Sequence, residues 1–111
     1  MKTKDVVARA QAEQDVNNAL DVYLTQASQK VALGFIDALE RAYRLISERP
    51  EIGATRFAYE LDLPGLRSWP LRGYPHAVFY MPRDDHIDVW RVLHAASDIP
   101  AWLIEESRGG A

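Results

Sequence analysis

The chain has 111 residues, of which 48% are hydrophobic and 26% charged, a length and composition that predict one globular domain and leave no room for two. It contains no cysteine, which excludes a disulfide framework and a thiolate metal site. Its formal net charge of −3 argues against a protein that coats nucleic acid, so we expect no direct specific nucleic-acid binding.

The first part of the chain predicts a strand and a helix. Residues 6–8 form a short apolar run rich in β-branched side chains, which indicates an opening strand. The apolar residues Val16, Leu20, Tyr23, Leu24 and Ala27 recur at the spacing of an amphipathic helix. Gln11 is a poor N-cap, so the sequence does not mark where this helix begins.

A second helix follows directly. Ser28 is a good N-cap, and Pro50 ends the helix at or before Arg49, because the residue before a proline is disfavoured in helical conformation. The short polar join between the helices predicts an antiparallel hairpin. The apolar stripe of the second helix, which we expect to cover a sheet, consists of Ala32, Phe35, Ile36, Leu39, Tyr43 and Ile46.

The second half of the chain predicts a loop and then three strands. Residues 51–65 carry Pro64 and two glycines without a sustained period, so we expect a loop around the edge of the domain. Residues 66–71, 77–81 and 87–93 are rich in Val, Trp, Tyr and Phe, and the turns between them favour antiparallel pairing. Pro70 marks the first of these runs as an edge strand or a bulge.

The C-terminal segment predicts one more short helix. Asp98 and Pro100 suit its first turn, and residues 102–104 are apolar. We expect the domain to span residues 1–108 and residues 109–111 to form a frayed tail. Residues 1–5 lack the apolar run of a secretory signal, and no apolar stretch reaches membrane-spanning length, so we expect a cytoplasmic protein without a membrane partner.

The order of these elements, β-α-α-β-β-β-α, predicts an α+β fold in which an antiparallel sheet packs on the N-terminal helical hairpin. The opposite face of the sheet is then expected to be open. An open face that carries Trp, Tyr and Arg side chains is a natural binding surface for a partner.

The predicted strand at residues 87–93 ends in Arg91-Val92-Leu93-His94 and is followed by Asp98. This segment, the most specific one, and several others resemble the ParE toxins (plasmid stabilisation proteins) of the RelE/ParE superfamily of toxin–antitoxin systems. One position departs from the family pattern, because Ser97 stands where the family often has an arginine. The other matching segments are Arg49-Pro50-Glu51-Ile52-Gly53, Leu66-Arg67, residues 73–80 and Val89-Trp90, so that the resemblance covers nearly the whole chain.

Similarity to ParE implies the RelE/ParE-like fold and the role of toxin in a type II toxin–antitoxin system. It further implies DNA gyrase as the target and a cognate antitoxin as the partner that silences the toxin. The two proteins would then assemble as a hetero-oligomer. Neither a cofactor nor a catalytic residue is expected for such a binder. The missing arginine at Ser97 removes one positive charge of the usual pattern.

The residues expected to contact a partner lie on the predicted strands and the turns between them. Arginines and aromatic side chains are the types that most often anchor protein interfaces. The candidates are Arg67, Trp69, Arg72, Tyr80, Trp90, Arg91 and His94.

An alternative function is that of a ribosome-dependent mRNA endoribonuclease, as in the RelE branch. Such a reaction needs a base, an acid and cations for the phosphate, roles for which His94, Arg72 and Arg91 are the candidates. We favour a structural interpretation, in which His94 ends a strand and bonds to the backbone near Asp98. The lysine-rich site typical of that branch is missing, since the lysines are only Lys2, Lys4 and Lys30.

A metal site is not expected. His76, His86 and His94 are scattered along the chain without a helical pair or a cysteine, which is a weak signal for metal binding.

Overall fold

The structure, a computed structural model, describes residues 3–109. Within these residues, no helix has the length and apolarity needed to cross a membrane. The elements along the chain are β1 (Asp5–Ala8), α1 (Ala10–Gln26), α2 (Gln29–Glu48), α3 (Arg56–Leu61), β2 (Arg67–Pro70), β3 (His76–Pro82), β4 (His86–His94) and α4 (Ile99–Gly109).

The four strands form one mixed sheet in the order β1-β4-β3-β2. β2, β3 and β4 are antiparallel neighbours, as predicted, whereas β1 pairs parallel to β4, from Asp5 opposite His86 to Ala8 opposite Val89. The expectation of a fully antiparallel sheet is therefore wrong at this edge. No turn joins β1 to another strand, because the helical hairpin follows it, so nothing local fixes its direction.

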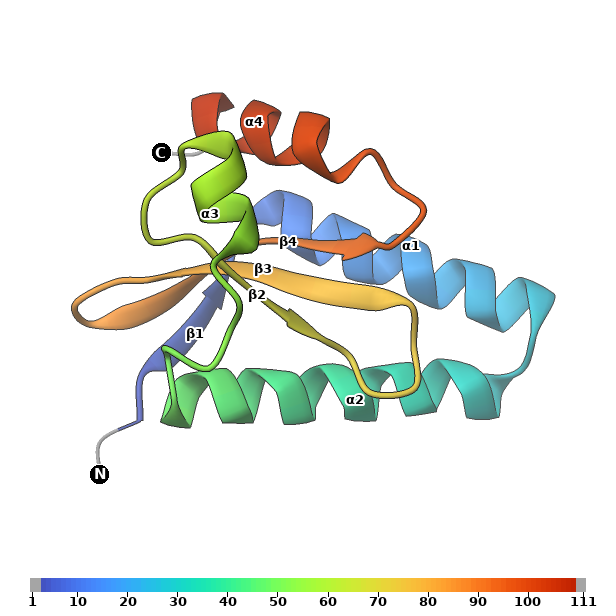
Figure 1. Cartoon of the computed structure of the whole chain (residues 1–111). Coiled ribbons are helices and arrows are strands. Elements are labelled where there is room, and N and C mark those ends of the chain that lie inside the picture. The colour runs from blue at the N-terminus through green and yellow to red at the C-terminus, as the bar shows by residue number, and fades with distance from the viewer. Residues whose placement is uncertain (1–2, 110–111) are drawn as a thin grey trace.

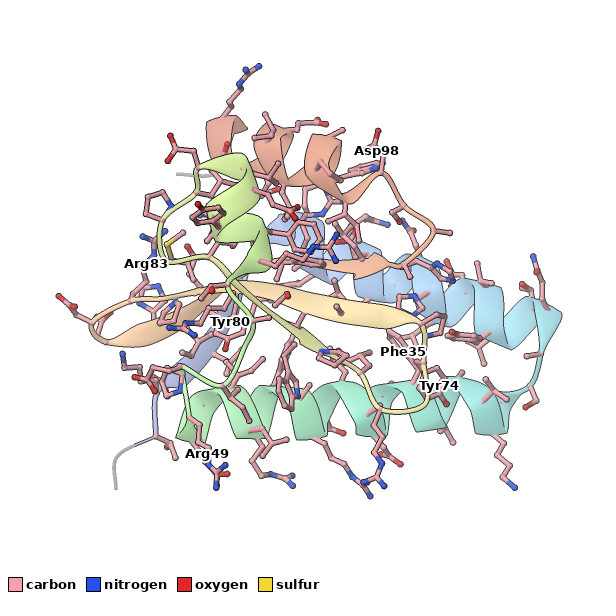
Figure 2. All side chains as sticks on the ribbon, viewed as in Figure 1. Phe35, Arg49, Tyr74, Tyr80, Arg83 and Asp98 are labelled. Atoms are coloured by element: carbon pink, nitrogen blue, oxygen red, sulfur yellow. The ribbon has the colours of Figure 1, made fainter. Side chains whose placement is uncertain are left out.

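The helical hairpin covers one face of the sheet, with α2 beneath the strands in Figure 1. The hydroxyl of Ser28 caps α2 by accepting a hydrogen bond from Val31 N at 3.1 Å. Phe35 and Tyr74 lie between α2 and the sheet (Figure 2). The predicted stripe of α2 is confirmed, since Phe35, Leu39 and Ile46 are buried there, whereas α1 begins at Ala10, well before the first residue of its predicted apolar stripe.

The opposite face is not open, because α3 and α4 cover it (Figure 1). Phe79, Trp90 and Leu93 of the sheet are buried there against Leu103 of α4 and the ring of Phe57 of α3. The sequence missed α3, which lies inside the predicted loop, because six residues are too few to display a helical period. The sheet is therefore buried on both faces.

A β-bulge in β4 decides which side chains face α4. Phe79 pairs with Arg91, but the next residue, Tyr80, pairs with Val89, so Trp90 is left without a partner. Such a bulge turns two consecutive side chains to the same face. Trp90 and Arg91 both lie on the α4 side, where Trp90 enters the apolar cluster and Arg91 reaches the helix.

α4 is longer than the short helix predicted from residues 102–104. It includes Arg108 and Gly109, which the sequence placed at or near a frayed end. The other two residues of the predicted tail, Gly110 and Ala111, lie outside the described residues.

Candidate functional site

A pocket of about 330 Å³ opens between α1, the end of β4 and the start of α4. A volume of this size can take one large side chain or a small ligand. Its polar and aromatic lining residues are Asp15, Asn18 and Tyr23 from α1, His76 from β3, Arg91 and His94 from β4, and Ser97 and Trp102 beyond it.

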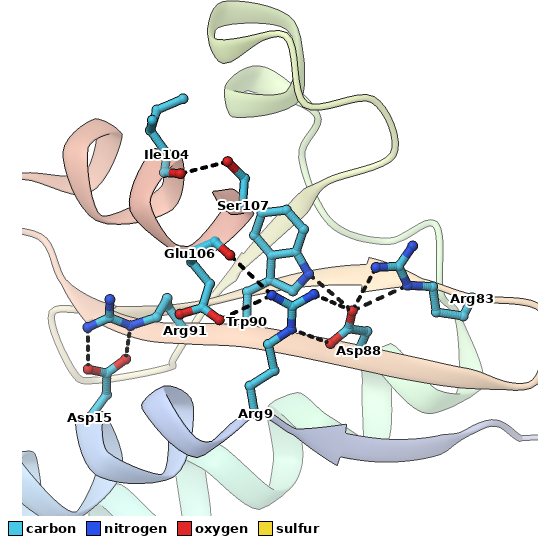
Figure 3. Close-up of polar contacts among 9 residues, drawn as sticks. All are labelled: Arg9, Asp15, Arg83, Asp88, Trp90, Arg91, Ile104, Glu106 and Ser107. Atoms are coloured by element: carbon cyan, nitrogen blue, oxygen red, sulfur yellow. Dashed lines mark hydrogen bonds and ion pairs between the residues drawn. The ribbon is translucent and has the colours of Figure 1, made fainter. Parts of the chain in front are cut away.

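A buried ion pair between Arg91 and Asp15 forms one wall of the pocket (Figure 3). Arg91 donates from Nη2 to Oδ1 and from Nε to Oδ2, both at 2.8 Å, and Val92 N donates to Oδ2 at 3.0 Å. The hydrogen bonds to Asp15 raise the pKa of Arg91, although burial opposes them. Its guanidinium also lies 4.5 Å from the ring centre of Trp102. The guanidinium of Arg91 thus contacts Asp15 through its edge and Trp102 through its face.

His94 ends β4 at the rim of the pocket and is exposed. Its Nδ1 accepts a hydrogen bond from Ala96 N at 2.9 Å. In the neutral imidazole the proton therefore sits on Nε2, which is left as a donor. This contact agrees with the structural interpretation of His94 as a strand-end residue bonded to the backbone.

His76 lies opposite His94 across β3 and β4, with ring centres 5.0 Å apart. Burial, reinforced by His94, lowers the pKa of His76 to about 4, while Asp15 acts in the opposite direction. Its Nδ1 is buried without a hydrogen-bond partner among the described residues. At neutral pH this imidazole is therefore uncharged.

The third histidine lies at the other end of β4. His86 Nδ1 is 2.6 Å from Oδ1 of Asp85 in the β3–β4 turn, so only two of the three histidines meet. Residues 3–109 contain no group of three or more side chains that could hold a metal ion.

A second polar network, centred on Arg9 and Asp88, fixes α4 on the sheet (Figure 3). Arg9 donates to both oxygens of Asp88, at 3.0 and 2.9 Å, and to Glu106 Oε2 at 3.1 Å. Arg83 and Trp90 donate to Asp88 Oδ2 at 2.8 and 3.2 Å. Burial alone would raise the pKa of Asp88, but the hydrogen bonds from Arg9 and Arg83 outweigh it and lower this pKa.

Three of the seven predicted partner-binding residues, Tyr80, Trp90 and Arg91, are buried in the isolated chain. The hydroxyl of Tyr80 donates to Pro50 O at 2.8 Å and accepts from Gly53 N at 2.9 Å. These side chains hold elements together and leave little surface for a partner.

The other four predicted residues are more accessible. Arg67 is half-buried and donates to the carbonyls of Glu51 and Gly53, both at 2.9 Å, and Trp69 is half-buried against the core. Arg72 and His94 are exposed. The structure brings His94 and Arg91 into one pocket, but Arg72 is not among its lining residues.

The sequence missed the α1 side of this pocket. Asp15 is far from Arg91 in the chain, and no local pattern indicates their contact. Val22 could have indicated this side of the pocket, because it is an apolar residue that lies outside the predicted stripe of its helix. Conversely, Leu24 was placed in that stripe but is 53% exposed.

Comparison with known proteins gives a family and a fold. The sequence model of the family described as "ParE toxin of type II toxin-antitoxin system, parDE" matches residues 6–99. A solved structure from P. aeruginosa, described as "Chromosomal ParDE TA system", matches with a TM-score of 0.68 and 17% sequence identity, over 83% of this chain and 96% of that chain. At this identity the likeness concerns the fold alone. No curated protein matches.

Proposed function

Because the chain belongs to the family of ParE toxins of type II toxin–antitoxin systems, we propose that it inhibits DNA gyrase by binding it and that a cognate antitoxin neutralises it. The resemblance to the ParE branch in the strand ending at His94 supports gyrase as the target. The match to a structure described as a ParDE system supports an antitoxin partner. The compartment proposed for both proteins is the cytoplasm.

The ion pair of Arg91 with Asp15 is the observation that favours a binding protein over an enzyme. Cleavage of RNA needs a free cation for the phosphate, and a buried guanidinium that already holds a carboxylate in two hydrogen bonds is not free. Freeing it would leave a charge buried without compensation, which is costly.

The hydrogen bonding of His94 also favours a binding protein over an enzyme. A general base needs a ring nitrogen with a free lone pair, whereas His94 uses Nδ1 to accept from Ala96 N and, in the neutral form, carries its proton on Nε2. Arg72, the third candidate of the endoribonuclease function, lies outside the lining of the pocket. We therefore propose that the pocket takes part in binding and assign it no catalytic residue.

Among the residues predicted to bind a partner, exposure favours Arg72 and His94 as direct contacts. Burial favours Tyr80, Trp90 and Arg91 as residues that shape the surface around them. Arg67 and Trp69, which are half-buried, remain candidates at the β2 edge of the sheet.

Two parallel assays test the proposal. The purified protein is incubated with gyrase and supercoiled or relaxed DNA in one, and with translating ribosomes and messenger RNA in the other. We expect inhibited supercoiling or trapped cleaved DNA together with intact message. Message cleavage with unaffected gyrase would establish the endoribonuclease instead.

Expression in cells tests the antitoxin. The protein expressed alone should arrest growth, and co-expression with the small protein encoded beside its gene should restore growth and yield a copurifying complex. Normal growth on strong expression of the folded protein would contradict a toxin.

A further inference from the structure

The pocket at the end of β4 exposes apolar surface on both of its sides. Val22 of α1 is 48% exposed and Trp102 of α4 is 41% exposed, and both line the pocket. An exposed tryptophan beside a pocket is typical of an interface anchor, because a large rigid side chain gains contact area at a low entropy cost.

The charge around this pocket is negative. Asp98, Trp102 and Glu105 are spaced four and three residues apart, so the two carboxylates flank the tryptophan on one side of α4. Figure 2 shows Asp98 on the loop that leads into the helix. Both carboxylates stand beside lining residues, since Asp98 follows Ser97 and Glu105 lies one turn after Trp102; the described residues that line the pocket itself include one carboxylate, Asp15, and one guanidinium, Arg91.

Two groups of the described residues lie near these carboxylates, because Ala101 N donates to Asp98 Oδ1 at 3.3 Å and Arg108 lines a neighbouring hollow together with Glu105, but neither forms an ion pair with them. Arg91 is matched by Asp15, while Asp98 and Glu105 take part in no ion pair. Glu105 does lie near Arg91, whose pKa is raised chiefly by the hydrogen bonds to Asp15 and further by the charges of Glu106 and Glu105. The pair of Arg91 and Asp15 is neutral, so the excess of negative charge beside the pocket is that of Asp98 and Glu105.

We propose that this pocket receives a basic side chain, Arg or Lys, from a segment of the antitoxin. This inference rests on the proposed function. The aliphatic stem of such a side chain packs on Val22 and Trp102, and its charged head points out of the pocket toward the side of α4 that carries Asp98 and Glu105. The net charge of −3 of the whole chain favours the approach of a basic segment.

Binding of the antitoxin encoded beside the toxin gene tests the charge. The variant Glu105→Lys places a positive charge at the rim, and Asp84→Lys makes the same change in the exposed turn at the far end of β4. We expect Glu105→Lys to weaken binding about tenfold at low salt of about 50 mM, with a smaller effect at about 500 mM. Asp84→Lys should change binding less than about twofold, as expected for a charge outside the interface.

A second pair of variants tests the apolar wall. Val22→Ser and Val7→Ser remove equivalent side chains, which are 48% and 53% exposed, from α1 and from the edge strand β1. We expect Val22→Ser to weaken antitoxin binding about fivefold at both salt concentrations and Val7→Ser to leave it unchanged.

Three outcomes would overturn this inference. Binding that is unchanged or tighter in Glu105→Lys excludes a basic side chain in the pocket. Equal effects of Glu105→Lys and Asp84→Lys indicate only the net charge of the toxin. Loss of binding in Val7→Ser but not in Val22→Ser places the antitoxin on the β1 edge. A wild-type toxin that binds no antitoxin at all, a result distinct from these three, contradicts the proposed function itself.

Discussion

A β-carbon on Gly53 would lie 2.6 Å from the hydroxyl oxygen of Tyr80. That hydroxyl is held in place, because it accepts from Gly53 N at 2.9 Å and donates to Pro50 O at 2.8 Å. The same β-carbon would lie 2.9 Å from Ser68 O of the neighbouring strand. The buried tyrosine thus requires a glycine in the segment that follows α2.

Gly53→Ala should therefore destabilise the protein by about 1 to 3 kcal/mol, because an added methyl group must displace well-packed backbone and side-chain atoms. Gly109→Ala is the control, since a β-carbon there meets nothing within 4 Å. The free energy of unfolding in urea measures both. Equal stability of Gly53→Ala and wild type would mean that this segment moves without cost.

Leu39→Ala should lower the free energy of unfolding by about 2 to 5 kcal/mol, because it leaves a cavity between α2 and the sheet. Leu39 is 8% exposed, and Leu33 on the same helix is 54% exposed. The matched variant Leu33→Ala should change stability by less than about 0.5 kcal/mol. Similar losses in both variants would contradict the placement of the α2 stripe.

Asp88→Asn should destabilise the protein by about 3 kcal/mol, because it removes the carboxylate that Arg9 and Arg83 share and leaves the buried guanidinium of Arg9 with Glu106 as its one remaining carboxylate partner among the described residues. Asp85→Asn, in the exposed turn before β4, is the same substitution and should have no measurable effect. Thermal unfolding at neutral pH compares the two. A tolerated Asp88→Asn would show that Glu106 alone compensates Arg9.

His76 should make stability depend on pH. Its folded-state pKa of about 4 lies below the usual value of 6.5, so between these two pH values the unfolded chain binds a proton that the folded chain does not bind. The free energy of unfolding therefore keeps its full value above pH 6.5 and falls by up to about 3 kcal/mol as the pH drops toward 4.

Substitution of His76 isolates this effect. His76→Phe should flatten the stability profile between pH 6.5 and 4 relative to that of the wild type. Unfolding in urea at a series of pH values gives both profiles. A slope that persists in His76→Phe must come from another group.

His94→Gln should separate binding from catalysis. Glutamine offers both a donor and an acceptor, so the fold should be kept, and a gyrase binder should lose at most the affinity of one contact. An endoribonuclease would lose message cleavage by about 10² to 10⁴-fold. Growth arrest and supercoiling inhibition that persist in the variant are the expected result.

The sequence predicts the elements with a strong local pattern. The α2 stripe, the cap at Ser28 and the three strands after residue 65 are confirmed, because burial on one side and turn residues at the ends determine them locally. α3 has neither signal. The parallel direction of β1 depends on a contact with β4, which no neighbouring residue specifies.

The sequence predicts only part of the candidate site, because the other residues of the site come from distant segments of the chain. His94 and Arg91 follow from the motif at the end of β4, but Asp15, Val22 and Trp102 join them only when α1 and α4 pack beside that strand. The sequence also suggested an exposed Trp90 and Arg91. The bulge in β4 turns Trp90 and Arg91 toward α4, and no residue pattern in this strand indicates a bulge.

The parallel pairing of β1 with β4 has a consequence for synthesis on the ribosome. Among the elements of the described residues β1 leaves the exit tunnel first, whereas its strand neighbour β4, which carries Asp88, and the helix α4, which carries Glu106, follow after the other elements. Contacts so distant in the chain form slowly and late. A nascent chain that stalls before α4 emerges leaves Arg9 without its partner Glu106, so this domain cannot complete its fold until α4 has left the ribosome.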